Sequence, residues 1–207
     1  MVRLFLGSAL PRSPFLPQAL LFYYHGNLSL TARLFPSFSS PGGKFDPERL
    51  ADLMYPHPTD QDYRRVLEDS LLQADGVVST AEISNPKQFD ANGEPCLIVV
   101  KNGGTTGTTV GRANGLESVK RTYPEYGIIK QDSLEIAVVS YGEGHGAFSD
   151  DGDSGSIVLT REGKILGMLT SGAGPTSETD VTWLTPFWWL QERIKRQYPG
   201  AYLYEVV

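Results

Sequence analysis

The stretch from Pro95 to Leu184 alternates short strand-forming segments with turns, and this spacing limits the folds that the chain can adopt. Its first segment, Cys96–Lys101, is an apolar run typical of a buried strand. Six further strands are predicted at Thr105–Arg112, Glu117–Thr122, Leu134–Ser140, Ser156–Thr160, Ile165–Ser171 and Val181–Leu184. Arg161–Lys164 is a hairpin turn, with Gly163 where a positive φ is needed. Short strands joined by turns predict a mainly β fold with an antiparallel barrel, because parallel strands need longer crossover connections.

Helices are expected before and after the barrel. A short helix is predicted around Pro47–Met54, with Asp46 as its N-cap and a proline in its first turn. Apolar residues at helical spacing predict a longer surface helix, which begins after Thr59 or Asp60. A closing helix, Pro186–Gln197, starts at a proline.

The amino-terminal part differs in kind from the rest. Residues 1–45 contain no Asp or Glu but several basic residues, serines and prolines, which is typical of an organelle transit segment or a disordered leader. Pro11, Pro14 and Pro17 break the amphipathic helix that a transit segment needs, and this favours the disordered leader. A third alternative is that the chain is an incomplete version of a longer protein. We predict an irregular leader over residues 1–40, a linker and helical segment over 41–94, and the barrel with its closing helix over 95–207.

One short motif, Gly152-Asp153-Ser154-Gly155-Ser156, suggests chemistry. A serine between glycines, in a loop that runs into an apolar strand, can act as a nucleophile. Gly152 lets the backbone approach a substrate carbonyl closely, and the N–H groups of Gly152 and Ser154 can point at one developing oxyanion. A nucleophile elbow is excluded, because it needs a glycine where Ser156 stands and a helix where a strand follows.

This pentapeptide resembles the nucleophile motif of the trypsin/chymotrypsin-like serine peptidases, and three further segments match that family in the same order. They are Lys101–Gly107, which is similar to the hairpin that opens the second barrel, Ile165–Gly172, similar to the strand that lines the substrate cleft, and Thr185–Ile194, similar to the closing helix. From about Phe45 onward the chain also resembles uncharacterised fungal proteins of trypsin-like type. The resemblance covers roughly Glu94 to Tyr198 and implies a serine endopeptidase-type domain, with Ser154 as nucleophile and Gly152 and Ser154 forming the oxyanion hole.

The resemblance also implies where substrate would bind. Phe148, six residues before the nucleophile, corresponds to the base of the specificity pocket and offers no negative charge to a Lys or Arg side chain. Thr170, Ser171 and Gly172 would form the wall that pairs with the substrate backbone.

The general base and its orienting acid are not identified. In the resembled family both come from a first barrel, and the residues before Pro95 contain no strand-turn series. His57 has the sequence context of an exposed turn residue, and His25 belongs to the leader. His145 lies nine residues before Ser154, in the same barrel as the nucleophile, whereas the family's base stands on the opposite wall. We therefore expect none of the three to act as the base.

The acidic residues near the motif also have ordinary interpretations. Glu135 opens a segment that resembles the one carrying the family's orienting aspartate, but it belongs to the second barrel, so we expect a solvent-facing strand residue. Asp150, Asp151 and Asp153 cluster in a turn, where we expect solvated carboxylates, with Asp153 hydrogen-bonded to loop amides. In the family this aspartate pairs with a newly freed Ile-Val-Gly-Gly amino terminus, which this sequence lacks, so no partner for Asp153 is predicted. We expect no metal and no other cofactor.

Composition narrows the partners. The 207 residues carry a net charge of −6, which gives no electrostatic basis for nucleic-acid binding. No apolar run approaches the ~20 residues needed to cross a bilayer, so no membrane partner is expected. The single cysteine, Cys96, excludes an internal disulfide, favours an intracellular protein and is expected to be a small buried apolar residue. The expected partner is a peptide or protein, as substrate or as ligand.

Two functions remain open at this point. The first is a serine peptidase whose base comes from one of these histidines or from another chain. The second is a protease-like module that binds an extended peptide along Thr170–Gly172 by strand addition and does not cut it. Because a serine without a base is a poor nucleophile at neutral pH, we expect at most a weak peptidase.

Overall fold

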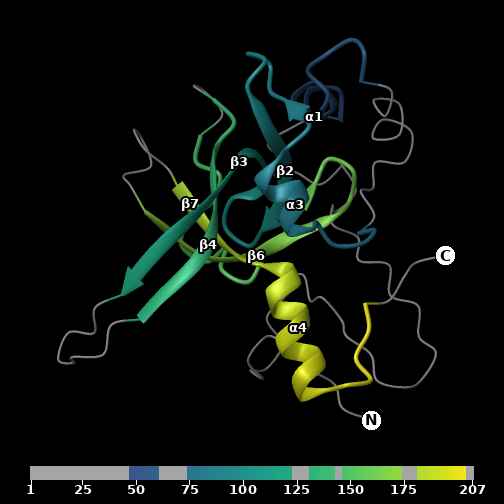
Figure 1. Ribbon diagram of the computed structural model, residues 1–207. Coiled ribbons are helices and arrows are strands. Elements are labelled where there is room, and N and C mark those ends of the chain that lie inside the picture. The colour runs from purple at the N-terminus through teal and green to yellow at the C-terminus, as the bar shows by residue number, and fades with distance from the viewer. Residues whose placement is uncertain (1–46, 61–73, 123–130, 143–145, 174–180, 204–207) are drawn as a thin grey trace.

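The barrel predicted from strand spacing is present. The computed structural model describes residues 47–60, 74–122, 131–142, 146–173 and 181–203 (Figure 1). Its barrel strands are β2 (Pro95–Gly103), β3 (Gly107–Thr122), β4 (Gln131–Ser140), β5 (Ile157–Thr160), β6 (Ile165–Ala173) and β7 (Val181–Pro186). They follow one another around the barrel in the order β2-β3-β4-β7-β6-β5, every pairing is antiparallel, and the pairing of β5 with β2 closes the barrel.

The helices agree in part with expectation. α1 (Pro47–Met54) has the predicted bounds, and α4 (Phe187–Gln197) begins one residue later than predicted, with Pro186 as its N-cap residue. The body of the expected longer helix, residues 61–73, and the expected cap Asp46 lie outside the described residues. No helix among the described residues has the length and apolar character needed to cross a membrane.

Two short elements were not predicted. α3 (Thr80–Ser84) begins at a capping box in which the Ser79 hydroxyl accepts from the Glu82 amide, while the Glu82 carboxylate accepts from the Ser79 amide. β1 (Gln88–Phe89) adds a two-residue edge to β2.

The predicted strands Thr105–Arg112 and Glu117–Thr122 are one continuous strand, β3. A register shift against β4 between Ala113 and Glu117 separates its two halves. Gly115 lies in this shift with φ +81, and a Cβ atom there would stand 2.6 Å from the Ile83 carbonyl oxygen of α3. The bulge therefore needs glycine both for its backbone conformation and for the close approach of α3.

β2 is buried on both faces, which explains its continuous apolar sequence. Leu97 and Val99 point into the barrel, where they join residues from all six strands in one core cluster. Cys96, Ile98 and Val100 point outward into a second core cluster, which the apolar face of α1 covers. The outer face of β2 is thus covered by α1, and this strand contributes to two separate layers of packing.

Cys96 behaves as the sequence predicts. It is a buried free cysteine on the outer face of β2. Burial, and next the negative charge of Asp90, raise the pKa of its thiol to about 11. The thiol is therefore protonated at neutral pH and is not a nucleophile.

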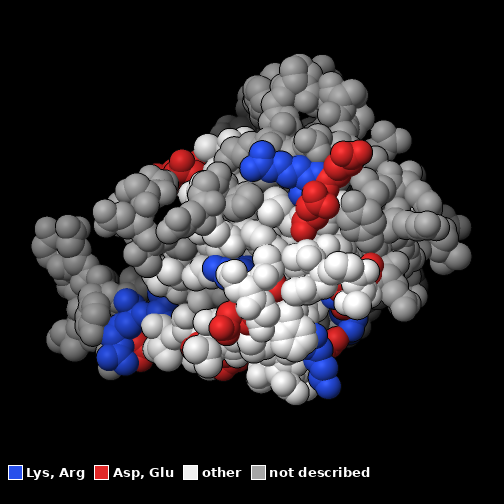
Figure 2. All heavy atoms as spheres, turned by 90° about the horizontal axis from the view of Figure 1, so that it is seen from above, with Lys and Arg blue, Asp and Glu red and all other residues white. Residues whose placement is uncertain are grey.

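The charged surface is mixed. On the face drawn in Figure 2, acidic and basic side chains are interspersed among uncharged residues. Partly exposed ion pairs such as Lys164 with Glu82 and Arg121 with Asp132 match this picture of alternating signs. Exposed pairs of this kind contribute only about 0–1 kcal/mol each, so the stability of the domain depends on its two core clusters.

Candidate functional site

The Gly152–Ser156 motif forms a tight loop that leads into β5. Gly152 and Gly155 have φ of +98 and +87, in the left-handed region that favours glycine. The Gly155 amide donates to the Leu169 carbonyl oxygen at 2.8 Å, and the Leu169 amide donates to the Ser156 carbonyl oxygen at 2.9 Å. These two bonds hold the loop against β6, the strand that the resemblance assigns to substrate binding.

Ser154 lies at the surface of this loop and is exposed. Within the described part of the chain, the amide N–H groups of Gly152 and Ser154 donate to no protein acceptor. Both groups are therefore available to an acceptor from outside, as an oxyanion hole requires. That they point at one common position remains a prediction.

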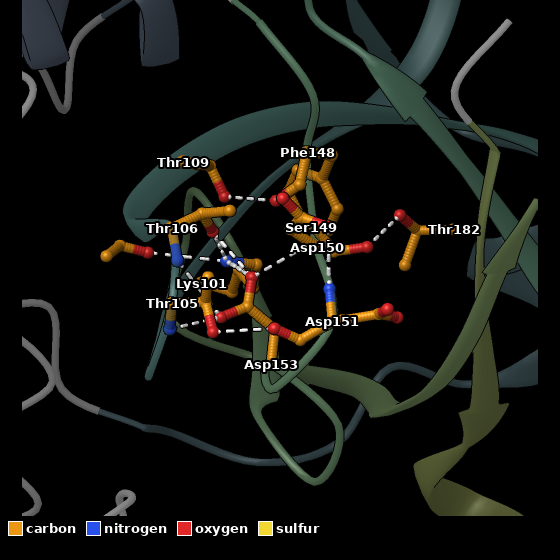
Figure 3. A network of polar contacts seen from close by, with 11 residues as sticks. Lys101, Thr105, Thr106, Thr109, Phe148, Ser149, Asp150, Asp151, Asp153 and Thr182 are labelled. Atoms are coloured by element: carbon orange, nitrogen blue, oxygen red, sulfur yellow. Dashed lines mark hydrogen bonds and ion pairs between the residues drawn. The ribbon is translucent and has the colours of Figure 1, made fainter. Parts of the chain in front are cut away.

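Asp153, the residue before the serine, is fully buried. One carboxylate oxygen accepts from the amides of Thr105 at 2.8 Å and Thr106 at 3.1 Å (Figure 3). The other accepts from the Thr106 hydroxyl at 2.6 Å and the Asp150 amide at 3.2 Å. The expectation that Asp153 binds loop amides is confirmed, and its side chain links this loop to the β2–β3 hairpin.

Asp153 also has an ionic partner, which the sequence analysis missed. The ammonium nitrogen of Lys101 lies 3.0 Å from the Asp153 carboxylate, and both side chains are 0% exposed. Lys101 also donates to the Thr106 hydroxyl at 2.6 Å and the Gly107 carbonyl oxygen at 3.3 Å (Figure 3). The conclusion that Asp153 has no partner was therefore wrong: a lysine within the barrel supplies the positive charge.

Two sequence signals could have revealed this pair. Lys101 is a charged residue at the end of a strand that is otherwise apolar on both faces, so its ammonium group must find a buried partner. Gly103 is the second signal. A Cβ atom there would lie 2.2 Å from an Asp153 carboxylate oxygen and 2.8 Å from the Lys101 ammonium nitrogen, so only glycine leaves room for the ion pair.

The electrostatics of Asp153 follow from these contacts. Burial alone raises the pKa of this carboxyl group, but the hydrogen bonds from Thr106 and Thr105 and the charge of Lys101 outweigh burial and lower it from 3.8 to about 2. Asp153 is therefore ionised at neutral pH, and the pair is a true ion pair.

Phe148 and Ser149 lie just before the loop and are both buried. The Phe148 ring is 1% exposed, belongs to the core cluster inside the barrel and lies with its centroid 5.6 Å from the Lys101 ammonium nitrogen. The Ser149 hydroxyl is 2.6 Å from the hydroxyl of Thr182 on β7 (Figure 3). The ring packs within the core. The role of Phe148 as the base of a specificity pocket remains a prediction.

The predicted substrate wall, Thr170–Gly172, is an open strand edge. β6 pairs with β7 as far as Ala173, whereas its pairing with β5 ends at Met168. Among the described strands, none covers the other edge of the wall. A Cβ atom on Gly172 would have ordinary van der Waals contacts, 3.5 Å to the Val181 carbonyl oxygen and 3.8 Å to the Ser149 hydroxyl oxygen, so this position tolerates a Cβ atom.

His57 lies far from the serine. Its Nε2 is 2.9 Å from the carbonyl oxygen of Asp90, in the turn that precedes β2, and the ring is half-buried. Asp153 binds Thr105, just beyond the other end of β2, and a nine-residue strand spans roughly 26 Å at ~3.3 Å per residue. His57 is therefore not the base for Ser154. It is also less exposed than predicted, because Asp90 holds its ring.

The other two histidines, His25 and His145, lie outside the described residues. The structure therefore brings Ser154, Gly152 and Thr170–Gly172 together, and it adds Lys101, but it brings no described histidine to them.

Glu135 is a second acidic residue whose expected environment was wrong. It is 6% exposed rather than solvent-facing, and its carboxylate accepts from the Thr185 hydroxyl at 3.1 Å. The reason is that the β3–β4 hairpin turns the face carrying Glu135 toward β7. Asp150 and Asp151 are exposed, as expected, and no cluster of potential metal ligands occurs in the described ranges.

No known protein-family model matches this chain, and no curated protein matches it significantly. The resemblance to a trypsin-like second barrel therefore depends on the motif residues and on the closed antiparallel barrel, with which it is compatible.

We predict that removing the buried cation destabilises the protein strongly. Lys101→Met leaves the Asp153 carboxylate buried without its counter-charge, which should lower the free energy of unfolding by about 3–5 kcal/mol. The matched control is Lys164→Met, because Lys164 pairs with Glu82 at the surface and its loss should cost about 0–1 kcal/mol. Urea denaturation of both variants measures the difference, and equal losses would contradict a structural role for the buried pair.

We further predict that Asp153 contributes to acid unfolding. Its pKa is lower in the folded state than in the unfolded state, so its contribution is present above about pH 4 and is lost as pH falls toward 2. The lost stability is about 2 kcal/mol. In Asp153→Asn the free energy of unfolding should therefore fall less steeply over this range. Asp151→Asn, an exposed neighbour with the same charge change, should retain the wild-type slope, and identical slopes in both variants would exclude the assignment.

Proposed function

We propose that this barrel is a serine-peptidase-type domain of trypsin-like kind that binds an extended peptide and cleaves it weakly or not at all. The observation that carries the proposal is the open edge of β6 at Thr170–Gly172, which adjoins the loop of Ser154. An extended peptide can add to such an edge through backbone hydrogen bonds, and its side chains then give specificity.

The buried ion pair supports binding of this kind. Lys101 and the hairpin amides hold Asp153 from inside the barrel, and Asp153 is the residue between the two amide donors of the loop. The loop geometry therefore does not require a freed amino terminus as its counter-charge. A peptide carbonyl next to Ser154 would meet amide groups that are already in place.

The proposal of weak or absent cleavage is supported by the position of His57, the one histidine within the described ranges. A serine hydroxyl needs a base within hydrogen-bond reach, and His57 lies at the other end of β2. Proteases of this kind that lack triad members retain ~10³–10⁴-fold catalysis over water, so a trace of hydrolysis agrees with the proposal.

A complete peptidase is the second candidate. It is favoured by the exposure of Ser154 and by the two amide donors without an acceptor among the described residues. Its base would come from His145, from His25 or from another chain.

We predict that peptide binding depends on the space beside the β6 edge. Gly172→Val keeps the fold, since a Cβ atom there has ordinary contacts, but its added methyl groups stand at the strand edge to which the peptide would add and should hinder that addition. A mixed pool of fluorescein-labelled octapeptides should bind the wild type, which an increase in anisotropy measures. Its affinity for Gly172→Val should be at least tenfold lower. The smaller change Gly172→Ala should give an intermediate loss, and circular dichroism checks the fold. If the wild type binds no member of the pool, the proposal is wrong.

A fluorophosphonate probe separates the two candidates. We predict that the purified chain is labelled only slowly, and that Ser154→Ala abolishes the labelling, because the hydroxyl is exposed and no histidine in the described ranges lies near it. Rapid labelling together with Ser154-dependent cleavage of casein would favour the complete peptidase. In that case His145→Ala and His25→Ala, compared with His57→Ala as the control, would identify the base.

A further inference from the structure

Lys120 is a charged residue that takes no part in the buried ion pair or in the hydrogen bonds of the serine loop. It lies in the second half of β3, beyond the register shift, in the hairpin that β3 and β4 extend away from the barrel (Figure 1). Its ammonium nitrogen lies 2.6 Å from the hydroxyl oxygen of Ser171 and 5.8 Å from the centroid of the Trp183 ring. It therefore stands directly beside the predicted peptide-binding edge of β6.

The alternation of side chains in the hairpin places Lys120 there. Val119 pairs with Leu134, and both are exposed, at 64% and 58%, on one face. Lys120 is on the opposite face, together with Glu135. The contacts of these two residues with Ser171 and Thr185 show that this second face is turned toward β6 and β7.

The Lys120 ammonium group has no carboxylate partner in the described part of the chain. Other cations of the barrel strands and turns form ion pairs: Lys101 with Asp153, Arg112 with Asp90, Arg121 with Asp132 and Lys164 with Glu82. Glu135, on the same face, is bound by the Thr185 hydroxyl and lies beyond ion-pair distance of Lys120. A hydroxyl and an aromatic ring leave donors of the half-buried ammonium group for a ligand.

We propose that Lys120 selects an acidic side chain in the peptide that binds along β6. The inference rests on the proposed peptide-binding function and names the ligand class. In a peptide paired with the edge at Ser171 and Gly172, alternate side chains point to one face of the sheet, so one of them lies on the side of Lys120. An Asp or Glu at that position forms a charge-assisted hydrogen bond with the ammonium group, which an amide of the same shape cannot replace.

The test uses octapeptides in which each position in turn carries Glu or the isosteric Gln, with affinities measured by fluorescence anisotropy. We expect the wild type to prefer Glu over Gln about tenfold at one position. Lys120→Met keeps most of the aliphatic stem but loses the charge, so the Glu/Gln ratio should fall to about one while affinity for the Gln peptide is retained. Lys120→Arg should keep the preference.

The matched control is Arg121→Gln, because Arg121 is the next residue, is exposed and points to the other face with Asp132 as its partner. This variant should keep the wild-type preference. If the wild type binds peptides without preferring Glu at any position, or if Lys120→Met keeps the preference, the assignment to Lys120 is wrong and the proposed function stands. If the wild type binds no peptide at all, the proposed function itself is wrong.

Discussion

The buried ion pair between Lys101 and Asp153 is the interaction on which the site depends. Moving two charges out of water costs several kcal/mol for each ion, and attraction alone does not always compensate. Here the cost is offset because Asp153 accepts four hydrogen bonds from Thr105, Thr106 and Asp150, while Lys101 also donates to Thr106 and Gly107. The pair therefore joins the β2–β3 hairpin to the serine loop at the bottom of the site. Because Asp153 is the neighbour of Ser154 in the chain, the pair also positions the backbone around Ser154.

The ion pair in turn depends on the double burial of β2. This strand has apolar residues on both faces, because the barrel interior covers one face and the core cluster with α1 covers the other. Lys101 follows as the last buried residue of the strand, paired in register with Thr109 and Val158, so its side chain is carried into the interior without access to water. There it forms an ion pair with Asp153, in the loop that precedes β5. Strand register thus decides loop position, over a sequence separation of more than fifty residues.

Local sequence patterns predicted much of the fold. Contacts between residues on opposite sides of the barrel could not be predicted from the sequence. Strand spacing predicted the antiparallel barrel, and the glycine of the Arg161–Lys164 turn has the expected positive φ, +88 at Gly163. The partner of Asp153 could not be predicted, because it depends on which strand lies beside the loop. Glu135 was expected in solvent because it opens a strand, but the bend of the hairpin toward β7 buries it. α3 was missed because five residues show too little periodicity, although its capping box was readable in Ser79 and Glu82.

The parts of the proposed serine-peptidase-type site differ in what stabilises them. The amide groups around Ser154 belong to a loop that the buried ion pair holds in place. Their position therefore depends on the stability of the fold and not on the reactivity of the Ser154 hydroxyl. A general base would contribute nothing to that stability, and His57, the one histidine in the described ranges, is bound to the turn before β2. The open edge of β6 likewise follows from the place where β5 begins, since its first residue, Ile157, pairs with Met168 and the residues before it form the serine loop. Peptide binding therefore needs only features that the fold already requires, whereas efficient cleavage needs one more group. This difference in physical origin is why we propose a binding function for the barrel in preference to a catalytic one.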